Sequence, residues 1–182
     1  MKVYDYIAEY IQKQGVRHAF GVTGGVITPV IDAYYRRKSN LEFICTTQEQ
    51  GASMAAEAYS RISGNFGVAM ATSGPGATNL ITGIGCAYFD SIPVLYLTGQ
   101  VSTLDSTYDG GPRQIGFQET DIVSIVKPIT KFSHKVTDPK KIKYYLDKAI
   151  YIAKSGRPGP VLLDLPMNIQ LAFLLGFGAL FG

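Results

Sequence analysis

Tryptophan is absent from the 182 residues, and the chain has only two cysteines and two histidines. Cys45 and Cys86 lie in apolar segments without CxxC spacing, which excludes a disulfide framework and a cysteine-rich zinc site and predicts two small core residues. No apolar run reaches the roughly 20 residues of a membrane-spanning helix. The first residues turn polar too soon for a signal peptide, so we expect a protein of the reducing cytoplasm.

A large excess of charge is also missing. Seventeen lysines and arginines against fourteen aspartates and glutamates give a formal charge of +3, which does not by itself indicate a nucleic-acid partner. We expect neither a nucleic-acid nor a membrane partner. With 46% hydrophobic and 17% charged residues, the chain is typical of a globular protein with a sizeable core, and its length fits one domain or one domain plus a short appendage.

Short apolar runs alternate with helix-like segments along the chain. This alternation predicts an α/β fold in which a parallel sheet is covered by helices on both faces. The predicted strands are 19–22, 43–45, 68–71, 94–97, 130–136 and 161–165. Helices are predicted over 3–14, ended by Gly15, after Thr28-Pro29, and after Asp138-Pro139. The segment 100–116 is rich in turn formers and is predicted to be a long loop.

Polar and small residues follow several of the predicted strands, at the edge of a parallel sheet where ligands bind. Gly74-Pro75-Gly76 can present backbone N–H groups to a phosphate, or can simply form a tight turn that lets a helix pack closely. Neither GxGxxG nor the P-loop pattern is completed there. Glu49 can likewise be a glutamate that only stabilises a helix N-terminus.

Five motifs, taken in order and spacing, resemble the acetolactate synthase family of thiamine diphosphate enzymes. They are Glu49-Gln50-Gly51-Ala52, residues 72–79 (TSGPGATN), Gly99-Gln100-Val101, residues 117–121 (FQETD) and residues 155–161 (SGRPGPV). The resemblance covers residues 1–170 and matches the family's N-terminal pyrimidine-binding (Pyr) domain. It implies a three-layer α/β/α fold with a six-stranded parallel sheet. Residues 171–182 are predicted to be an apolar tail outside the family pattern.

The resemblance also assigns roles to single residues. Glu49 is the implied catalytic residue: its carboxyl group would hydrogen-bond a ring nitrogen of the cofactor's aminopyrimidine and so promote loss of the thiazolium proton. To share a proton with the ring, this carboxyl needs an apolar surrounding, for which Met54, Ala55 and Ala56 are candidates. The implied ring-lining positions are Gly24, Gly25, Thr72, Pro75 and Asn79. Phe117 and Gln118 match positions at the substrate end of the pocket, and Gly74 and Gly76 would serve close approach to a ring rather than to phosphate.

Three positions depart from the family pattern. Gln48 stands where histidine is usual, Ser102 where proline is common, and Met167 where lysine is usual; the loop before Phe117 is also about six residues longer than in the family. These changes touch the substrate side, so thiamine diphosphate binding is expected to be better kept than acetolactate specificity.

The family's Gly-Asp-Gly motif, which belongs to a second domain that holds the diphosphate and its Mg²⁺, does not occur in this sequence. The one Asp-Gly pair, Asp109-Gly110, follows Tyr108 inside the predicted loop. A middle domain that holds FAD in true acetolactate synthases is not encoded either, so FAD is possible only in a longer enzyme. We therefore expect no metal site in this chain, and no activity without a diphosphate-binding domain, supplied in trans or by a longer protein.

The resemblance implies a carboligase that decarboxylates a 2-oxo acid such as pyruvate and joins the product to a second carbonyl compound. Homo-oligomers are expected, because the pocket is built between domains, usually of two chains. A truncated gene and a genuinely split enzyme both fit the sequence. A Pyr subunit of a split 2-oxo acid decarboxylase and a non-catalytic remnant remain alternatives.

Overall fold

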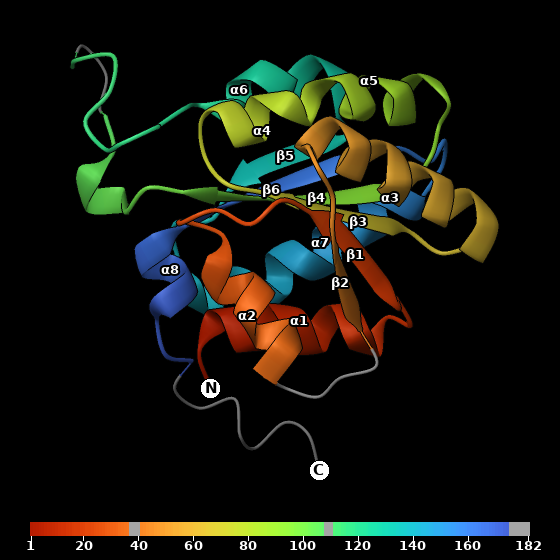
Figure 1. Cartoon of the computed structure of the whole chain (residues 1–182), viewed down its shortest axis with the longest axis horizontal. Coiled ribbons are helices and arrows are strands. Elements are labelled where there is room, and N and C mark those ends of the chain that lie inside the picture. Colours follow the sequence, from red (N-terminus) through yellow and green to blue (C-terminus); the bar gives the residue numbers. More distant parts are fainter. Residues whose placement is uncertain (37–40, 108–110, 175–182) are drawn as a thin grey trace.

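Six parallel strands form a single sheet at the centre of the protein (Figure 1). The structure is a computed structural model that describes residues 1–36, 41–107 and 111–174. The strands are β1 (His18–Gly21), β2 (Glu42–Cys45), β3 (Gly67–Ala71), β4 (Val94–Gln100), β5 (Phe132–Lys135) and β6 (Val161–Pro166). Their order is β2-β1-β3-β4-β6-β5, and every neighbouring pair is parallel. The six-stranded α/β fold expected from the sequence is confirmed.

Helices cover both faces of this sheet, as the alternation of apolar runs predicts. On one face lie α1 (Val3–Lys13), α2 (Thr28–Arg36), α7 (Ile142–Lys154) and α8 (Met167–Leu171). On the other lie α3 (Glu49–Ser63), α4 (Pro75–Asn79), α5 (Ile81–Phe89) and α6 (Ile122–Val126) (Figure 1). Three 3₁₀ turns complete the fold: η1 (Thr103–Asp105), η2 (Lys127–Ile129) and η3 (Pro139–Lys141).

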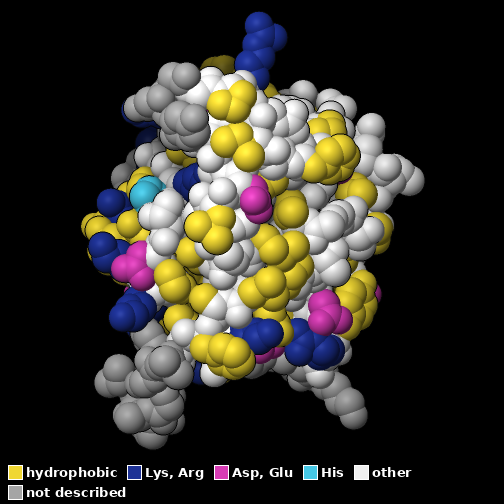
Figure 2. Space-filling model, turned by 90° about the vertical axis from the view of Figure 1, so that its left-hand side faces the viewer, with side chains coloured by type: hydrophobic (Ala, Val, Ile, Leu, Met, Phe, Trp, Pro, Cys, Tyr) yellow, Lys and Arg dark blue, Asp and Glu magenta, His cyan; other side chains and the backbone are white. Residues whose placement is uncertain are grey.

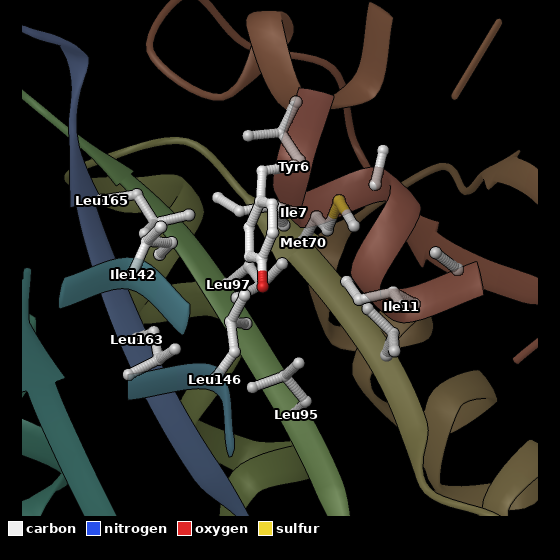
Figure 3. Packing of buried hydrophobic residues seen from close by; sticks show 14 of the residues in the cluster. Tyr6, Ile7, Ile11, Met70, Leu95, Leu97, Ile142, Leu146, Leu163 and Leu165 are labelled. Carbon is white, nitrogen blue, oxygen red and sulfur yellow. The ribbon is translucent and has the colours of Figure 1, made fainter. Parts of the chain in front are cut away.

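Two apolar clusters stabilise the layers. The larger one lies between the sheet and the layer of α1, α2 and α7, where Tyr6 and Ile7 of α1 and Leu146 of α7 meet strand residues such as Leu97 (Figure 3). The smaller one joins the sheet to α3, α5 and α6. Strands β3, β4 and β6 are buried at every position. This explains why their sequences are mostly apolar, since strands covered on both faces have no side that faces solvent.

Gly15 and Asp138 mark a helix end and a helix start, as the sequence predicted. The helix expected over 3–14 is α1, and Gly15 follows it with a φ of +78°, a left-handed conformation that favours glycine. Asp138 begins the turn η3 and accepts a 3.0 Å hydrogen bond from Lys140 N. α7 continues from that turn to Lys154.

The prediction that both cysteines are core residues is wrong. Cys45 is exposed because it is the last residue of β2, which is an edge strand, and Cys86 on α5 is half-buried. Both are free thiols, so the exclusion of a disulfide holds for the two cysteines of the chain.

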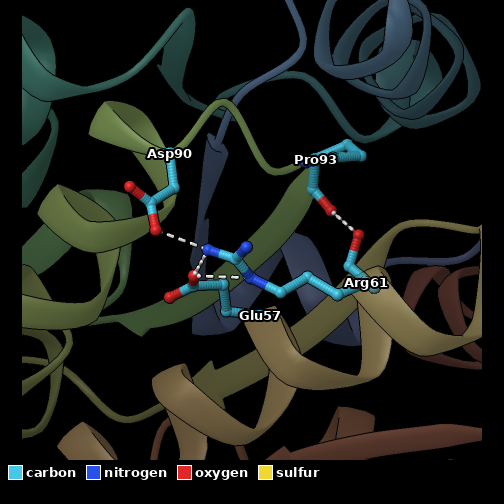
Figure 4. Close-up of polar contacts among 5 residues, drawn as sticks. Glu57, Arg61, Asp90 and Pro93 are labelled. Atoms are coloured by element: carbon cyan, nitrogen blue, oxygen red, sulfur yellow. Dashed lines mark hydrogen bonds and ion pairs between the residues drawn. The ribbon is translucent and has the colours of Figure 1, made fainter.

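A polar network ties α3 to the segment that follows α5. Arg61 donates to Glu57 Oε1 over 2.6 Å and also pairs with Asp90, as Figure 4 shows. Ser60, the residue before Arg61, donates from its Oγ to Pro93 O over 2.9 Å. These bonds fix the long helix α3, whose first residue is Glu49, relative to the sheet.

The chain ends described by the structure lie side by side. Val3 N donates to Ala172 O over 3.0 Å, and Leu174 N donates to Met1 O over 2.9 Å. Leu174 is buried in the larger apolar cluster. Residues 171–174 of the predicted tail therefore pack on α1, while 175–182 lie outside the described residues and the domain boundary at 170 stays a prediction. No helix among the described residues has the length and apolar character needed to cross a bilayer.

Candidate functional site

The candidate site lies where the strand order reverses. Strand β1 has β2 on one side and β3 on the other, so the connections from β1 and from β3 leave the sheet in opposite directions. Such a switch point opens a crevice at the carboxyl ends of parallel strands. The turn 22–27 follows β1 at this edge, and Thr72 and the start of α4 follow β3. Of the five predicted cofactor-lining positions, Gly24 and Gly25 lie on this turn, Thr72 and Pro75 lie at the start of the second segment, and Asn79 ends α4.

Gly24 and Gly76 are held against Thr72 by very close contacts. A Cβ atom on Gly24 would lie 2.5 Å from Thr72 Cβ, and one on Gly76 would lie 2.8 Å from Thr72 Cγ2 and 3.3 Å from Glu49 Oε1. Only glycine fits either position without displacing its neighbours. A Cβ on Gly25, in contrast, would meet nothing within 4 Å. Gly25 is exposed, so it offers bare backbone to a ligand.

Glu49 is the first residue of α3, and its carboxylate lies against the end of α4. Asn79 Nδ2 donates to Glu49 Oε2 over 3.0 Å. The structure thus brings together two residues that lie 30 positions apart and were assigned to one pocket. Glu49 also lies in the first turn of α3, where a carboxylate stabilises a helix N-terminus, so both interpretations of this residue agree with its position. The side chain of Gln48, before it, makes no capping hydrogen bond.

The surroundings of Glu49 are only partly apolar within this chain. Its side chain is half-buried, Asn79 is exposed, and Met54 is 42% exposed. Ala56 is buried in the smaller apolar cluster. The described residues of this chain therefore leave one side of the Glu49 carboxylate open.

Gly74 and Pro75 connect the cofactor-side residues to the predicted substrate-side residues. Pro75 is at the first position of α4, and Gly74 before it has a φ of +62°. A Cβ on Gly74 would lie 2.8 Å from Gln118 Cβ and 2.9 Å from Gln118 O. Close packing thus explains the glycines on both sides of Pro75: Gly74 lies against Gln118, and Gly76 lies against Thr72.

Phe117 and Gln118 line an open hollow of about 530 Å³ beside α4. Its lining residues are Gly74, Pro75, Thr78, Gln114, Phe117, Gln118, Glu119 and Thr120. Phe117 is 83% exposed, and Gln118 has a φ of +61°. On the face that Figure 2 shows, apolar side chains spread over the middle and most charged ones lie nearer the margin.

Glu119, which was not among the predicted site residues, organises the loop before Phe117. Glu119 accepts hydrogen bonds from Thr107 N at 2.7 Å, Thr107 Oγ1 at 3.0 Å and Ile115 N at 3.1 Å. Burial disfavours the charged form of Glu119, but these three bonds and the charge of Lys135 together outweigh burial and lower its pKa below the usual range. Residues 108–110 of this loop, with Asp109-Gly110, lie outside the described residues. The sequence signal for Glu119 was its position inside the family motif of residues 117–121.

A buried acid, Asp164, was also missed as a polar centre. It lies on β6 and accepts from Thr98 Oγ1 at 2.7 Å and from Gln100 Nε2 at 3.0 Å, both on the neighbouring strand β4. Burial raises the pKa of Asp164 to about 7, and the two hydrogen bonds oppose that shift. A lone acid inside a strand that is otherwise apolar was the signal available in the sequence.

Comparison with known proteins decides the family. Residues 1–125 match the family model described as thiamine pyrophosphate enzyme, N-terminal TPP binding domain. The chain belongs to this family. It is similar to the acetolactate synthase large subunit of Porphyra purpurea, with 46% identity over 91% of the chain and 27% of the relative.

Two further relatives show how widely the similarity extends. The acetolactate synthase isozyme 2 large subunit of Escherichia coli K12 is 45% identical over 92% of the chain and 29% of the relative. The probable acetolactate synthase large subunit of Methanocaldococcus jannaschii is 44% identical over 93% of the chain and 27% of the relative. The chain thus spans less than a third of the length of these relatives, and it corresponds to the Pyr domain expected from the motifs.

The three positions that depart from the family pattern lie at the starts of helices or turns. Gln48 precedes α3, Ser102 Oγ caps the turn η1 by accepting from Leu104 N, and Met167 begins α8. No group of three or more potential metal-ligating His, Cys, Asp or Glu residues is found in the described part of the chain.

Proposed function

We propose that this chain is the Pyr domain of an acetolactate synthase-like carboligase in which Glu49 is the catalytic residue. The observation that carries the proposal is the joint position of Glu49, Asn79, Gly24 and Gly76 around Thr72 at the switch point of the sheet. Membership in the thiamine pyrophosphate enzyme family supports it.

The residues present fit an aminopyrimidine ring. Gly25 leaves space that a side chain would fill, and Thr72 is held between the two glycines that a Cβ would displace. Glu49 offers a carboxyl group and Asn79 an amide, which suit the ring nitrogen and the exocyclic amine of a pyrimidine. When bound, thiamine diphosphate supplies the carbanion chemistry that protein side chains lack.

Glu49 would hold and move one proton at a pyrimidine nitrogen. Asn79 donates to Glu49 Oε2, which leaves Oε1 on the side that faces Gly76. Asn79 thereby fixes the direction of the carboxyl group as well as lining the ring. General acid–base groups contribute most when they are held in such a fixed geometry.

A diphosphate-binding domain would complete the site. Glu49 is half-buried and Asn79 and Pro75 are exposed, so this chain leaves the carboxylate accessible to water. A domain packed on this side would remove that water and favour proton sharing with the ring. Such a domain would also hold the diphosphate and Mg²⁺, and FAD in a longer enzyme. We propose the contact forms in a homo-oligomer of the cytoplasm.

The proposed substrate is a 2-oxo acid such as pyruvate, with Phe117 and Gln118 at its side of the pocket. Phe117 is 83% exposed in this chain, which suits a residue that completes a pocket with another domain. The three departures from the family pattern lie on the substrate side, so the acceptor is the least constrained part of the proposal. A decarboxylase that releases an aldehyde is the alternative that these departures favour.

Calorimetric titration with thiamine diphosphate and Mg²⁺ tests the proposal. The chain is titrated alone and then co-expressed with a diphosphate-binding domain that carries Gly-Asp-Gly. We expect binding only in the second case, followed by conversion of pyruvate to a carbon–carbon ligation product. Release of aldehyde alone would favour the decarboxylase. An intact fold with no binding in either case would reject a catalytic role.

The Gly25→Val variant is a matched probe for the ring position. Gly25 has open space around it, so valine is expected to leave the fold intact while it fills the space proposed for the ring. Binding by Gly25→Val equal to wild type in the assembled protein would contradict the assigned position.

A further inference from the structure

The short helix α8 is tied to the turn that carries two of the predicted cofactor-lining glycines. Gln170 on α8 is fully buried, and its side-chain Nε2 donates to Val26 O over 2.6 Å and to Leu165 O over 2.7 Å. Val26 belongs to the turn 22–27 between β1 and α2, and it lies 144 positions before Gln170. One side chain of the last described helix therefore holds a turn near the beginning of the chain.

The same turn packs tightly on strand β4. Gly99 is in register with Leu165 where β4 pairs with β6, and Leu165 supplies the second carbonyl group that Gln170 binds. A Cβ atom on Gly99 would lie 2.3 Å from Val26 O and 2.8 Å from Ile27 N. Glycine is therefore needed for the backbone of the turn to approach β4 this closely. The peptide group between Val26 and Ile27 is held at two points, by contact with β4 and by the hydrogen bond from α8.

This peptide group in turn fixes Gly24. Ile27 N and Thr28 N donate to Gly24 O over 3.1 and 3.0 Å, and Thr28 Oγ1 donates to the same oxygen over 2.8 Å. A Cβ atom on Gly24 would lie 2.5 Å from Thr72 Cβ, so the turn already touches the segment that follows β3. The distance between Gly24 and Thr72 thus depends on where the turn is held.

The side-chain amide of Gln170 is only partly satisfied. Its two N–H groups are used by the two carbonyl groups, which fixes the orientation of the amide. Its Oε1 is buried and has no hydrogen-bond partner in the described part of the chain. A buried acceptor without a partner destabilises a fold, and such local losses of stability are typical of functional sites.

We propose that Gln170 is a positioning residue for the cofactor: its two hydrogen bonds set the place of the turn 22–27 and so of the ring-lining glycines. Because Gln170 is fully buried, it acts through the turn and not by contact with the ring. This inference rests on the proposed function, since it takes Gly24 and Gly25 as part of a pyrimidine site. Gln170 lies outside the segment 1–125 that matches the family model.

Amide hydrogen exchange of the full chain, followed by NMR, tests the hold on the turn. Gln170→Met keeps the length of the side chain and removes both donors together with the unpaired oxygen, so we expect it to fold. The Ile27 and Thr28 amides should exchange about tenfold faster than in wild type, beyond any change in the buried amides of β3, which report global stability. If Gln170→Met does not fold, Gln170→Asn tests the same bonds, because it keeps the amide but is one methylene too short to reach both carbonyl groups.

Asn65→Leu is the matched control variant. It removes another side-chain amide that donates to a backbone carbonyl, Gln14 O over 2.8 Å, but at the amino ends of the strands and so at the opposite edge of the sheet. It should leave the exchange of the Ile27 and Thr28 amides at the wild-type rate relative to β3. Equal acceleration of these amides in Asn65→Leu and Gln170→Met would overturn the proposal.

Calorimetric titration with thiamine diphosphate and Mg²⁺, on each variant assembled with a diphosphate-binding domain, tests the consequence for the cofactor. At a temperature where all proteins are folded, Gln170→Met should bind about tenfold more weakly than wild type, and Asn65→Leu should bind as wild type does. A wild-type assembly that binds no cofactor would reject the proposed function and this role with it. Normal binding by wild type together with equal binding by Gln170→Met would overturn the role of Gln170 alone.

Discussion

The variants Gly24→Ala and Gly25→Ala together test the packing of the candidate site most sharply, because Gly24 is tightly packed and the neighbouring Gly25 has open space around it. An added Cβ at Gly24 lies 2.5 Å from Thr72 Cβ, whereas one at Gly25 meets nothing within 4 Å. Carbon atoms in ordinary contact are about 3.5 to 4.0 Å apart. At Gly24 the turn must therefore move by about 1 Å, and the atom it meets is fixed to the backbone at the end of β3.

Such overpacking costs about 1–3 kcal/mol. In a chain of this size 1 kcal/mol changes the melting temperature by about 2–4 °C, so Gly24→Ala is expected to lower it by roughly 2–12 °C. Gly25→Ala is expected to change stability by at most about 0.5 kcal/mol. Thermal unfolding followed by circular dichroism measures both. A Gly24→Ala protein as stable as wild type, or equal losses in the two variants, would refute the described contact.

Three further variants follow from the polar groups and the exposed aromatic residue. Burial raises the pKa of Asp164 from 3.8 to about 7, so Asp164 loses its proton at lower pH in the unfolded chain than in the folded one, and its contribution to stability falls as pH rises between those values. Asp164→Asn should therefore lack this pH-dependent loss of stability in thermal melts from pH 4 to 8. A pH profile identical to that of wild type would contradict this prediction. Because the pKa of Glu119 is lowered in the folded protein, its contribution to stability is present above its pKa in the unfolded chain and is lost as pH falls. Glu119→Gln should cost about 1 kcal/mol of stability at pH 7 and speed hydrogen exchange at the Thr107 and Ile115 amides. Amides that stay protected in this variant would contradict the role of Glu119 in holding the loop. Phe117→Ala should leave the melting temperature of the chain within about 2 °C, since the ring is 83% exposed, but should raise KM for pyruvate in the assembled enzyme; a large loss of stability would show a packing role instead.

Much of the fold could be predicted because local chemistry decides it. The apolar runs of β3, β4 and β6 are buried throughout, and Gly15 and Asp138 mark helix ends through a positive φ and a capping bond. Cys45 was misjudged because its apolar neighbours do not tell that β2 is an edge strand. Strand order is a property of the whole sheet and leaves little trace in a short segment.

The site was only partly predictable for a similar reason. Glu49 and Asn79 were assigned to one pocket from the family motifs, and a hydrogen bond joins them. The Asp164 centre depends on the register that pairs Asp164 with Thr98, and the Glu119 anchor depends on how a long loop closes. Neither register nor loop closure follows from residue spacing along the chain.

Glu49 is proposed to move a proton for thiamine diphosphate, and the exchange of the cofactor's thiazolium proton with deuterium tests this role most directly. The rate is measured by NMR for wild type and Glu49→Gln, each assembled with a diphosphate-binding domain. Glutamine keeps the size and one acceptor oxygen, so cofactor binding is expected to change by only a few fold. We expect exchange to slow by about 100-fold or more, the usual contribution of a general acid–base group. Exchange at the wild-type rate in the cofactor-loaded Glu49→Gln protein would contradict the proposed role.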